Sequence, residues 1–586
     1  MTYKKQIKNF VFFSESENEV AFEGLQNENG ITEVKISVNF KQKQIPEPLV
    51  IKWTYPCKNV FSQWNPALNT GRALNPVWRP IKNNSRSAEG MPIQTHLSLD
   101  GKNIITVSLD DPLTPMEIET AIIEETAEIS YRLTLFKDRI SPISVYETVL
   151  RIDTRKKSYF DIIDETAKKW SNVETKIPEE CNMPMYSTWY SYHQMLNHEE
   201  LIEELRLAKE YGMESVIIDD GWQTNDGQKG YAYCGDWKSI RIPDMKKLVS
   251  DVHDVGMKCL VWFAIPFVGI HSEAWEKFQG KFLNQLDENN PWCVLDPRYP
   301  DVREYLINIC KNAVSEWGID GLKIDFIDRF RLTEYSSLPD SNMDFESLED
   351  AITCLLREIK ENLIAVDPDI MIEFRQPYTG PIMRKCGNML RVVDCPMDAV
   401  KNRAGIVDLK MIAGNTAVHS DMLMWNYADT PEAAALQIIN VFFGVPQISV
   451  LIEKLPDKHK RVLKFYLSLW IKYRECIING KLKAENPEAG YSIVSCERAR
   501  EVIAVAYIKN ILKLTQNYEK IIYINGSWER ELFINNYSCE YDVRFKIYDC
   551  MGSVTDQGEI TLRKGITGFK VPHILIMDIL AIENKL

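Results

Sequence analysis

The chain has 586 residues, of which 45% are hydrophobic and 26% charged, a composition typical of globular proteins. This length exceeds what one hydrophobic core usually organises, so we expect two or three domains. The formal net charge is -14, and no basic cluster is interleaved with aromatic residues, which argues against nucleic acid as a partner. No apolar run approaches the roughly 18 to 20 residues that a membrane-spanning helix requires.

The amino-terminal sequence and the cysteines indicate the cellular compartment. The amino terminus lacks the uninterrupted apolar stretch of a secretory signal. The 13 cysteines are scattered without CxxC pairs, which favours a reduced interior over a disulfide framework or a zinc site. Histidines of the central region match no metal-ligand spacing. We therefore expect a cytoplasmic protein that needs no metal and no cofactor.

Short alternating segments between turn residues mark both ends of the chain. Alternation of apolar and polar residues over such lengths is typical of strands. The candidate strands are residues 33–40, 103–109, 501–507 and 520–525. The sequence therefore predicts a β-sandwich domain over residues 1–170 and a second, antiparallel one over residues 479–586.

Residues 171–478 alternate short apolar runs with amphipathic segments of helical period, such as 199–209, 345–363 and 457–471. The candidate strands number eight: 185–189, 215–219, 257–264, 321–325, 369–374, 389–394, 421–424 and 447–451. Eight βα units predict an α/β fold of the (β/α)8 TIM-barrel type, whose chemistry lies at the carboxyl ends of the strands.

Asp325 ends the fourth candidate strand and is the candidate nucleophile. Lys323 lies two residues earlier, so both side chains project from the same side of the strand. A neighbouring lysine keeps a carboxylate ionised, as an attack on an anomeric carbon requires. The competing interpretation is an ion pair between Lys323 and Asp325 that closes the barrel.

A second acid is needed to protonate the leaving oxygen and then to activate water. Asp394 ends the sixth candidate strand, with Arg391 nearby, whereas Asp398 begins the following loop. This placement favours Asp394 over Asp398 but leaves both open. Glu373 is the acid near the end of the fifth strand.

Asp219 and Asp220 end the second candidate strand and precede a glycine turn. Paired carboxylates at a strand end suit hydrogen bonding to neighbouring sugar hydroxyls. A metal site or a helix cap are the alternative interpretations.

Several motifs occur in the order seen in glycoside hydrolase family 36, which the chain resembles over nearly its whole length. They are YSTW at 186–189, IIDDGWQ at 217–223, GDW at 235–237, GMKCLVW at 256–262, LKID at 322–325 and RVVD at 391–394. The family comprises α-galactosidases and raffinose-synthase-like relatives with an amino-terminal β-supersandwich, a catalytic barrel and a carboxyl-terminal β-domain.

The resemblance implies a role for each matching position. Asp325 is the implied nucleophile and Asp394 the implied acid/base, while Asp219 and Asp220 bind the 4- and 6-hydroxyls of galactose. Trp189 is the implied platform beneath the sugar ring, and Trp237 is the implied wall near its hydroxymethyl group. Lys323 and Arg391 are implied to position hydroxyl and carboxylate groups.

Two stretches depart from the family pattern. After the fifth strand the family carries a cysteine and a glycine-rich stretch, whereas this chain reads EFRQPY at 373–378. The resemblance implies that this stretch shapes the side of the pocket that holds the 2-hydroxyl region. The acid/base string reads VDCPMD at 393–398, with one extra residue between its acids.

The sequence thus predicts a retaining α-galactosidase that acts on terminal α-galactosides of oligosaccharides. The alternatives are a transglycosylase, a glycosidase for α-N-acetylgalactosamine or β-L-arabinopyranose, and a non-catalytic carbohydrate-binding barrel. Self-association through the large β-domains is a further expectation.

Overall fold

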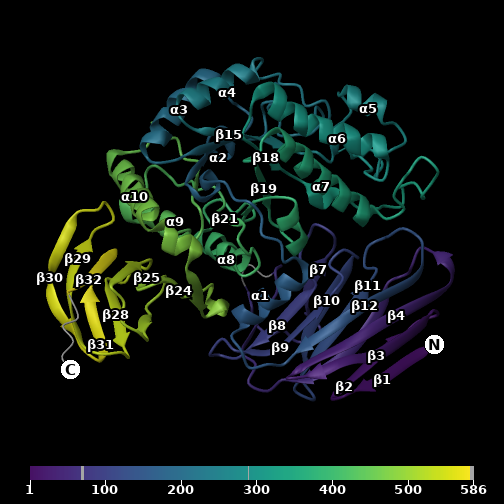
Figure 1. Cartoon of the computed structure of the whole chain (residues 1–586), viewed down its shortest axis with the longest axis horizontal. Coiled ribbons are helices and arrows are strands. Elements are labelled where there is room, and N and C mark those ends of the chain that lie inside the picture. The colour runs from purple at the N-terminus through teal and green to yellow at the C-terminus, as the bar shows by residue number, and fades with distance from the viewer. Residues whose placement is uncertain (68–70, 288, 581–586) are drawn as a thin grey trace.

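The computed structural model describes residues 1–67, 71–287 and 289–580. Two six-stranded antiparallel sheets form the amino-terminal part, a ring of parallel strands wrapped by helices forms the centre, and a smaller β-domain forms the carboxyl-terminal part (Figure 1). The predicted (β/α)8 barrel between two β-domains is confirmed. Among the described residues, no helix is both long and apolar enough to cross a membrane.

The two amino-terminal sheets pack their apolar faces against each other. In the strand 31–44, Val34, Ile36 and Val38 are buried while their neighbours are partly exposed, as the period of two predicts. One sheet has the order β1 (Thr2–Ile7), β2 (Phe10–Glu15), β5 (Leu49–Pro56), β11 (Glu128–Leu135), β10 (Met116–Ile123) and β7 (Ile81–Ser85). The other has the order β3 (Glu19–Glu28), β4 (Ile31–Gln44), β12 (Ile143–Asp153), β9 (Asn103–Leu109), β8 (Ile93–Leu97) and β6 (Ser62–Trp64).

Eight parallel strands form the central sheet. In spatial order they are β21 (Ala417–His419), β20 (Met389–Arg391), β19 (Met371–Arg375), β18 (Gly321–Ile324), β15 (Lys258–Phe263), β14 (Ser215–Ile218), β13 (Met185–Ser187) and β22 (Gln447–Ile448). The ring closes just before β22, where the Val445 amide donates to the Val418 carbonyl at 2.8 Å. A small hairpin, β16 (Phe267–Gly269) with β17 (Trp292–Val294), lies outside it.

One of the eight predicted strand positions is wrong. The seventh strand is 417–419 and not 421–424, because a polar residue, His419, ends the short buried strand and hides it from a search for apolar runs. The fifth strand continues to Arg375, one residue beyond the predicted end. Asp421 therefore follows the seventh strand at the carboxyl edge of the barrel instead of beginning that strand.

Helices cover the outside of the barrel, and several of them begin at a capping side chain. The Asn197 side chain accepts from the Glu200 amide, and Ser347 accepts from the Asp350 amide, which satisfies free amides of the first turn. The helices are α1 (Tyr159–Trp170), α2 (Trp189–Tyr192), α3 (His198–Glu210), α4 (Met245–Asp254), α5 (Glu273–Lys277), α6 (Pro300–Asn312), α7 (Leu348–Val366), α8 (Ala399–Lys410), α9 (Pro431–Asn440) and α10 (Asp457–Asn479).

The carboxyl-terminal part holds a seven-stranded and a three-stranded sheet, mostly antiparallel. The pairs β25–β27 and β26–β28 are parallel. The larger sheet has the order β23 (Lys481–Glu485), β24 (Ile493–Arg498), β25 (Glu501–Ala506), β27 (Lys520–Asn525), β32 (Ile574–Ile579), β29 (Tyr541–Tyr548) and β30 (Val554–Leu562). The smaller has the order β26 (Ile511–Leu514), β28 (Glu531–Asn536) and β31 (Gly565–Lys570).

A buried polar cluster joins all three parts. Arg72 of the amino-terminal part donates to Asp408 of α8 and to the Tyr491 hydroxyl of the carboxyl-terminal part, both at 2.5 Å. Tyr491 and the Trp64 indole also donate to Asp408, at 2.6 and 3.0 Å. Because Arg72 and Asp408 are both almost fully buried, each needs the other to offset its lost hydration.

Candidate active site

The carboxyl ends of four barrel strands bring together most of the residues predicted from sequence. These strands are β14 and, beyond β15, the three adjacent strands β18, β19 and β20. In the parallel register, Lys323 lies opposite Glu373, and Arg375 lies opposite Arg391. Residues two apart share a face, so Lys323 with Asp325 and Glu373 with Arg375 point to the same side of the sheet. The strands thus build successive layers of charged groups toward the mouth of the barrel.

Asp325 is 5% exposed and is fixed by four donors. Its Oδ1 atom accepts from the Phe326 amide at 2.8 Å, from Arg375 Nε at 2.9 Å and from the Tyr378 hydroxyl. Among the residues that the structure describes, its Oδ2 atom accepts from Trp262 Nε1 alone, at 2.9 Å. Since a carboxylate oxygen has two lone pairs, Oδ2 keeps the capacity to form a new bond.

The charge of Asp325 is stabilised by its surroundings. Burial alone raises the pKa of this carboxyl group, but the positive charges of Arg375 and Lys323 and the hydrogen bonds from Tyr378 and Trp262 outweigh burial and hold the pKa well below its usual range. The surroundings of Asp325 therefore favour its ionised form.

Arg375 and Tyr378 are site residues that the sequence analysis did not identify. Both belong to the EFRQPY stretch that departs from the family pattern, and both contact Asp325. The spacing rule that linked Lys323 to Asp325 would have found Arg375, because it lies two residues after Glu373 on the same strand.

Lys323 does not form the alternative ion pair with Asp325. Its ammonium group donates to Asp219 Oδ2 at 2.6 Å, and both side chains are almost fully buried. Asp219 Oδ1 also accepts from the Asp220 amide at 2.9 Å. Lys323 therefore links the second and fourth strands and acts on Asp325 through its charge, without a hydrogen bond.

Asp220 has a different environment from its neighbour. Gln223 and Gln194 donate to its two oxygens at 2.7 and 2.8 Å, and no cation pairs with it among the described residues. Burial first, and then the nearby charges of Asp219 and Asp325, raise the pKa of Asp220 to about 6. This carboxyl group therefore changes its charge close to neutral pH.

Arg391 organises the acids that follow the fifth, sixth and seventh strands. Its guanidinium donates to Asp421 Oδ1 at 2.5 Å and to Asp394 Oδ1 at 2.8 Å, and its Nε lies 3.5 Å from Glu373 Oε1. Arg391, Glu373 and Asp421 are fully buried. Burial raises the pKa of Glu373 to about 7. Asp421, misplaced by the sequence analysis, is thus part of the site.

Asp394 and Asp398 differ in what they contact. The Asp394 side chain is 43% exposed and held by Arg391 alone among the described residues. Against the effect of burial, Arg391 and Arg375 hold its pKa below the usual value. Asp398 caps α8, where its Oδ1 accepts from the Lys401 amide at 2.9 Å. The local geometry therefore favours Asp394 over Asp398 as the group that faces substrate.

The two predicted aromatic contacts also differ. Trp189 is partly exposed at the start of α2, with the His193 ring edge-on at 4.9 Å and Lys229 at 6.0 Å from the indole. Trp237 is 4% exposed and packs against Trp222 and Trp262, with ring centroids 6.0 and 5.9 Å away. Trp189 is thus partly open to solvent, whereas Trp237 is buried within an aromatic cluster.

A turn of the amino-terminal part reaches the barrel mouth. Arg86 donates to the Asp328 carbonyl and pairs with Glu89 at 2.7 Å, and Glu89 pairs with Arg331 at 2.9 Å. The Gly90 amide donates to the Pro377 carbonyl at 3.1 Å. The turn therefore holds the segments that follow β18 and β19, which carry Asp325 and Tyr378.

Comparison with known proteins connects this geometry to a family. The Melibiase family model matches residues 169–377. The α-galactosidase AgaA of Geobacillus stearothermophilus is 26% identical over 164 residues, which are 26% of this chain and 22% of AgaA. The A type blood α-D-galactosamine galactosaminidase of Flavonifractor plautii is 23% identical over 188 residues, 29% of this chain and 16% of that protein. The matches thus span less than a quarter of either relative.

Solved structures share the fold over the whole chain. The α-galactosidase of Lactobacillus brevis superposes with a TM-score of 0.65 at 14% identity and covers 100% of this chain and 84% of its own. AgaA in complex with raffinose is described as a glycoside hydrolase family 36 α-galactosidase. It superposes with a TM-score of 0.63 at 14% identity, and the match covers 99% of this chain and 84% of the AgaA chain. The resemblance to glycoside hydrolase family 36 is therefore confirmed, in sequence over the first half of the barrel and in fold throughout.

Proposed function

We propose that this protein is a retaining α-galactosidase, with Asp325 as nucleophile and Asp394 as acid/base. The observation that carries the proposal is the asymmetry of the Asp325 carboxylate, in which three donors fix Oδ1 and one donor leaves Oδ2 able to attack. The similarity to α-galactosidases, one of them in complex with raffinose, supports galactosides of oligosaccharides as the substrate class.

The reaction has two displacements. In the first, Asp325 Oδ2 attacks the anomeric carbon, the glycosidic C–O bond breaks, and Asp394 gives its proton to the leaving oxygen. In the second, Asp394 takes a proton from water, whose oxygen attacks the same carbon and releases Asp325. The sugar leaves with its original anomeric configuration, because two inversions cancel.

Asp394 must gain a proton before the first displacement. Arg391 and Arg375 favour its ionised form in the free protein. Because its side chain is 43% exposed, a bound sugar removes water from it and raises its pKa. Substrate binding and proton uptake are therefore coupled in this mechanism.

Asp219 and Asp220 select the sugar. Their oxygens line the end of β14 beside Lys323, and the resemblance assigns them the 4- and 6-hydroxyls of galactose. An ionised carboxylate accepts two hydroxyl hydrogen bonds at once, which discriminates against a sugar whose 4-hydroxyl points the other way.

The test is nitrophenol release from α- and β-linked nitrophenyl sugars by the wild type, by Asp325→Ala and by Asp325→Ala with azide. We expect turnover of the α-galactoside, its loss in the variant, and its recovery with azide as β-galactosyl azide. A wild type that turns over no α-glycoside would refute hydrolysis. A variant that keeps its activity would refute Asp325 as nucleophile.

A second candidate is action on a related sugar or transfer to an acceptor. It is favoured by Arg375 and Tyr378, which stand where the family carries a cysteine and glycines, and by the similarity to a galactosaminidase. The same panel decides, with α-N-acetylgalactosaminide and β-L-arabinopyranoside included and with free sugars added as acceptors. Acceleration by an acceptor indicates transfer, and binding without turnover of any sugar indicates a carbohydrate-binding barrel.

The cytoplasm is the proposed compartment. All 13 cysteines are free thiols in the structure, and most of them are buried, which suits a reducing environment. Fractionation of the native cells tests this placement.

A further inference from the structure

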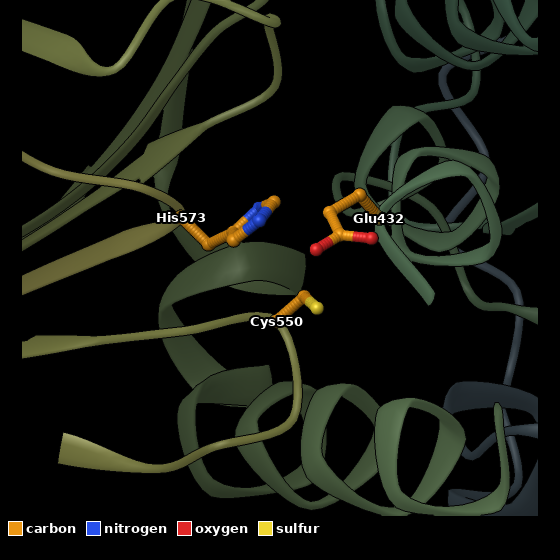
Figure 2. Close-up of side chains that lie close together, drawn as sticks. All are labelled: Glu432, Cys550 and His573. Carbon is orange, nitrogen blue, oxygen red and sulfur yellow. The ribbon is translucent and has the colours of Figure 1, made fainter. Parts of the chain in front are cut away.

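Three residues capable of binding a metal meet where the barrel touches the carboxyl-terminal sheets. Glu432 lies in the first turn of α9, Cys550 follows β29, and His573 precedes β32. One carboxylate oxygen, the thiol sulfur and one imidazole nitrogen all lie within 4.8 Å of one another. Figure 2 shows the carboxylate of Glu432 turned toward the imidazole of His573, with Cys550 close to both.

Cys550 packs in the main hydrophobic cluster, whereas one polar atom of the group, on His573, has no partner in the part of the chain that the structure describes. His573 is 8% exposed, and its Nδ1 atom is buried without a hydrogen-bond partner among the described residues. Cys550 is 2% exposed. A buried imidazole nitrogen without a partner loses its hydration, and no hydrogen bond offsets this loss. A metal ion that accepts the lone pair of the nitrogen would account for its position.

We propose that Glu432, Cys550 and His573 bind one Zn²⁺ ion that joins α9 of the barrel to the carboxyl-terminal sheet. Thiolate, imidazole and carboxylate are the ligands that zinc prefers, and three protein ligands leave the fourth tetrahedral position to a water molecule. Calcium and magnesium are excluded by the sulfur and nitrogen ligands, because both prefer oxygen.

The distances permit such a site after small side-chain movements. Zinc–ligand bonds of about 2.0 to 2.3 Å at tetrahedral angles place ligand atoms about 3.5 Å apart. Because the three ligand atoms lie within 4.8 Å of one another, no separation needs to shorten by more than roughly 1 Å. Cys550 and His573 lie in segments between strands and Glu432 in a first helical turn, so rotation of side chains can supply this movement without moving a sheet.

Binding of Zn²⁺ to these three residues releases one proton and changes no oxidation state. The Cys550 thiol gives its proton to solvent, the Glu432 carboxylate and neutral His573 bind as they are, and no electron is transferred. The ion replaces weak contacts between two parts of the chain with three coordinate bonds. The site is separate from the proposed catalytic residues, so the ion would stabilise the interface and take no part in glycoside cleavage.

The test uses the full-length protein after treatment with a chelator and return to buffer. Zn²⁺ bound after dialysis is measured by elemental analysis, and Co²⁺ is used as a spectroscopic substitute. We expect about one Zn²⁺ per chain, and with Co²⁺ a thiolate-to-metal charge-transfer band. Both should be lost in Cys550→Ser and in His573→Asn, whereas the matched control Cys539→Ser, an exposed cysteine of the same sheet domain, should keep them.

Thermal unfolding gives an independent measurement. Added Zn²⁺ should raise the unfolding temperature of the wild type and of Cys539→Ser, EDTA should reverse the shift, and Glu432→Gln should reduce it. A wild type that binds far less than one equivalent and shows no charge-transfer band with Co²⁺ would overturn the proposal. A band that persists in Cys550→Ser would overturn the assignment of the thiol. Even if one variant fails to fold, the wild-type titration and His573→Asn decide.

Discussion

Asp325 and Asp394 both follow barrel strands and both lie beside an arginine, yet their surroundings are opposite in kind. Asp325 is buried and held by four donors, whereas the Asp394 side chain is 43% exposed and held by Arg391. A nucleophile must keep one orientation and one charge, which the dense set of donors around Asp325 provides. An acid/base must exchange a proton with solvent and substrate in every cycle, and the exposure of Asp394 suits the role proposed for it.

The difference also shows how one local environment can set two functions. One arginine and one lysine act on both acids, because the charges of Arg375 and Lys323 lower the pKa of Asp325 and that of Asp394. Only Asp394 can be transferred from water to a substrate-filled pocket. We therefore expect its pKa, and not that of Asp325, to rise when a sugar binds.

Among the changes that distinguish the two acids, Asp394→Ala should have the largest effect on activity. Hydrolysis of an oligosaccharide should fall by about 10²- to 10⁴-fold, since its leaving oxygen needs a proton. A nitrophenyl galactoside, whose leaving group needs none, should lose less. Azide should then yield the α-galactosyl azide, with the configuration opposite to that expected for Asp325→Ala. Product configuration measured by NMR checks this.

Asp398→Ala is the matched control. It removes the cap of α8, which costs about 0.5 to 2 kcal/mol of stability, while activity should stay within about threefold of the wild type. If Asp398→Ala, and not Asp394→Ala, abolishes hydrolysis of the oligosaccharide, the assignment of the acid/base is reversed.

A smaller effect is expected for Arg375→Gln. Loss of one charged hydrogen bond to Asp325 should lower kcat/KM by roughly 10- to 100-fold. Removing the positive charge also raises the pKa of Asp325, so the acidic limb of kcat/KM, along which activity rises as the nucleophile ionises, should move to higher pH. In Arg375→Lys, which keeps the positive charge, the acidic limb of kcat/KM should lie at the same pH as in the wild type. An unchanged limb in Arg375→Gln would show that Arg375 does not control the ionisation of Asp325.

The smallest effect concerns Asp220, whose pKa is raised where those of Asp325 and Asp394 are lowered. Below about pH 6 it gains a proton and accepts fewer hydroxyl hydrogen bonds, so KM should rise as pH falls through this value. Asp220→Asn should raise KM by about tenfold and remove this dependence on pH. A KM that follows the same pH curve in the variant would assign the effect to another group.

Much of the fold was predictable from the sequence because its signals are local. Buried parallel strands read as apolar runs, and seven of the eight candidate strands overlap the strands of the barrel. The seventh was missed because its three residues end in a buried histidine, whose partner, the Cys181 carbonyl at 2.8 Å, comes from a distant segment. Burial of a polar residue depends on such a partner, which pattern alone does not reveal.

The site was predictable where a residue lies at a strand end, and less so where its role depends on contacts across strands. Lys323 and Asp325 share a strand face, but the choice of Asp219 as the partner of Lys323 is made between strands. Asp421 was misplaced together with its strand. Glu432 precedes Cys550 and His573 by more than a hundred residues of chain, so no short spacing motif brings the three together.

The buried cluster of Arg72, Asp408 and Tyr491 has a consequence for dissecting the protein. A fragment that ends at the edges of the barrel would carry Asp408 without its guanidinium partner, and an uncompensated buried charge costs about 3 to 5 kcal/mol. That loss is comparable to the whole stability of many domains. We therefore expect the three parts to unfold together, and the barrel to lose stability when it is expressed without the sheets on either side.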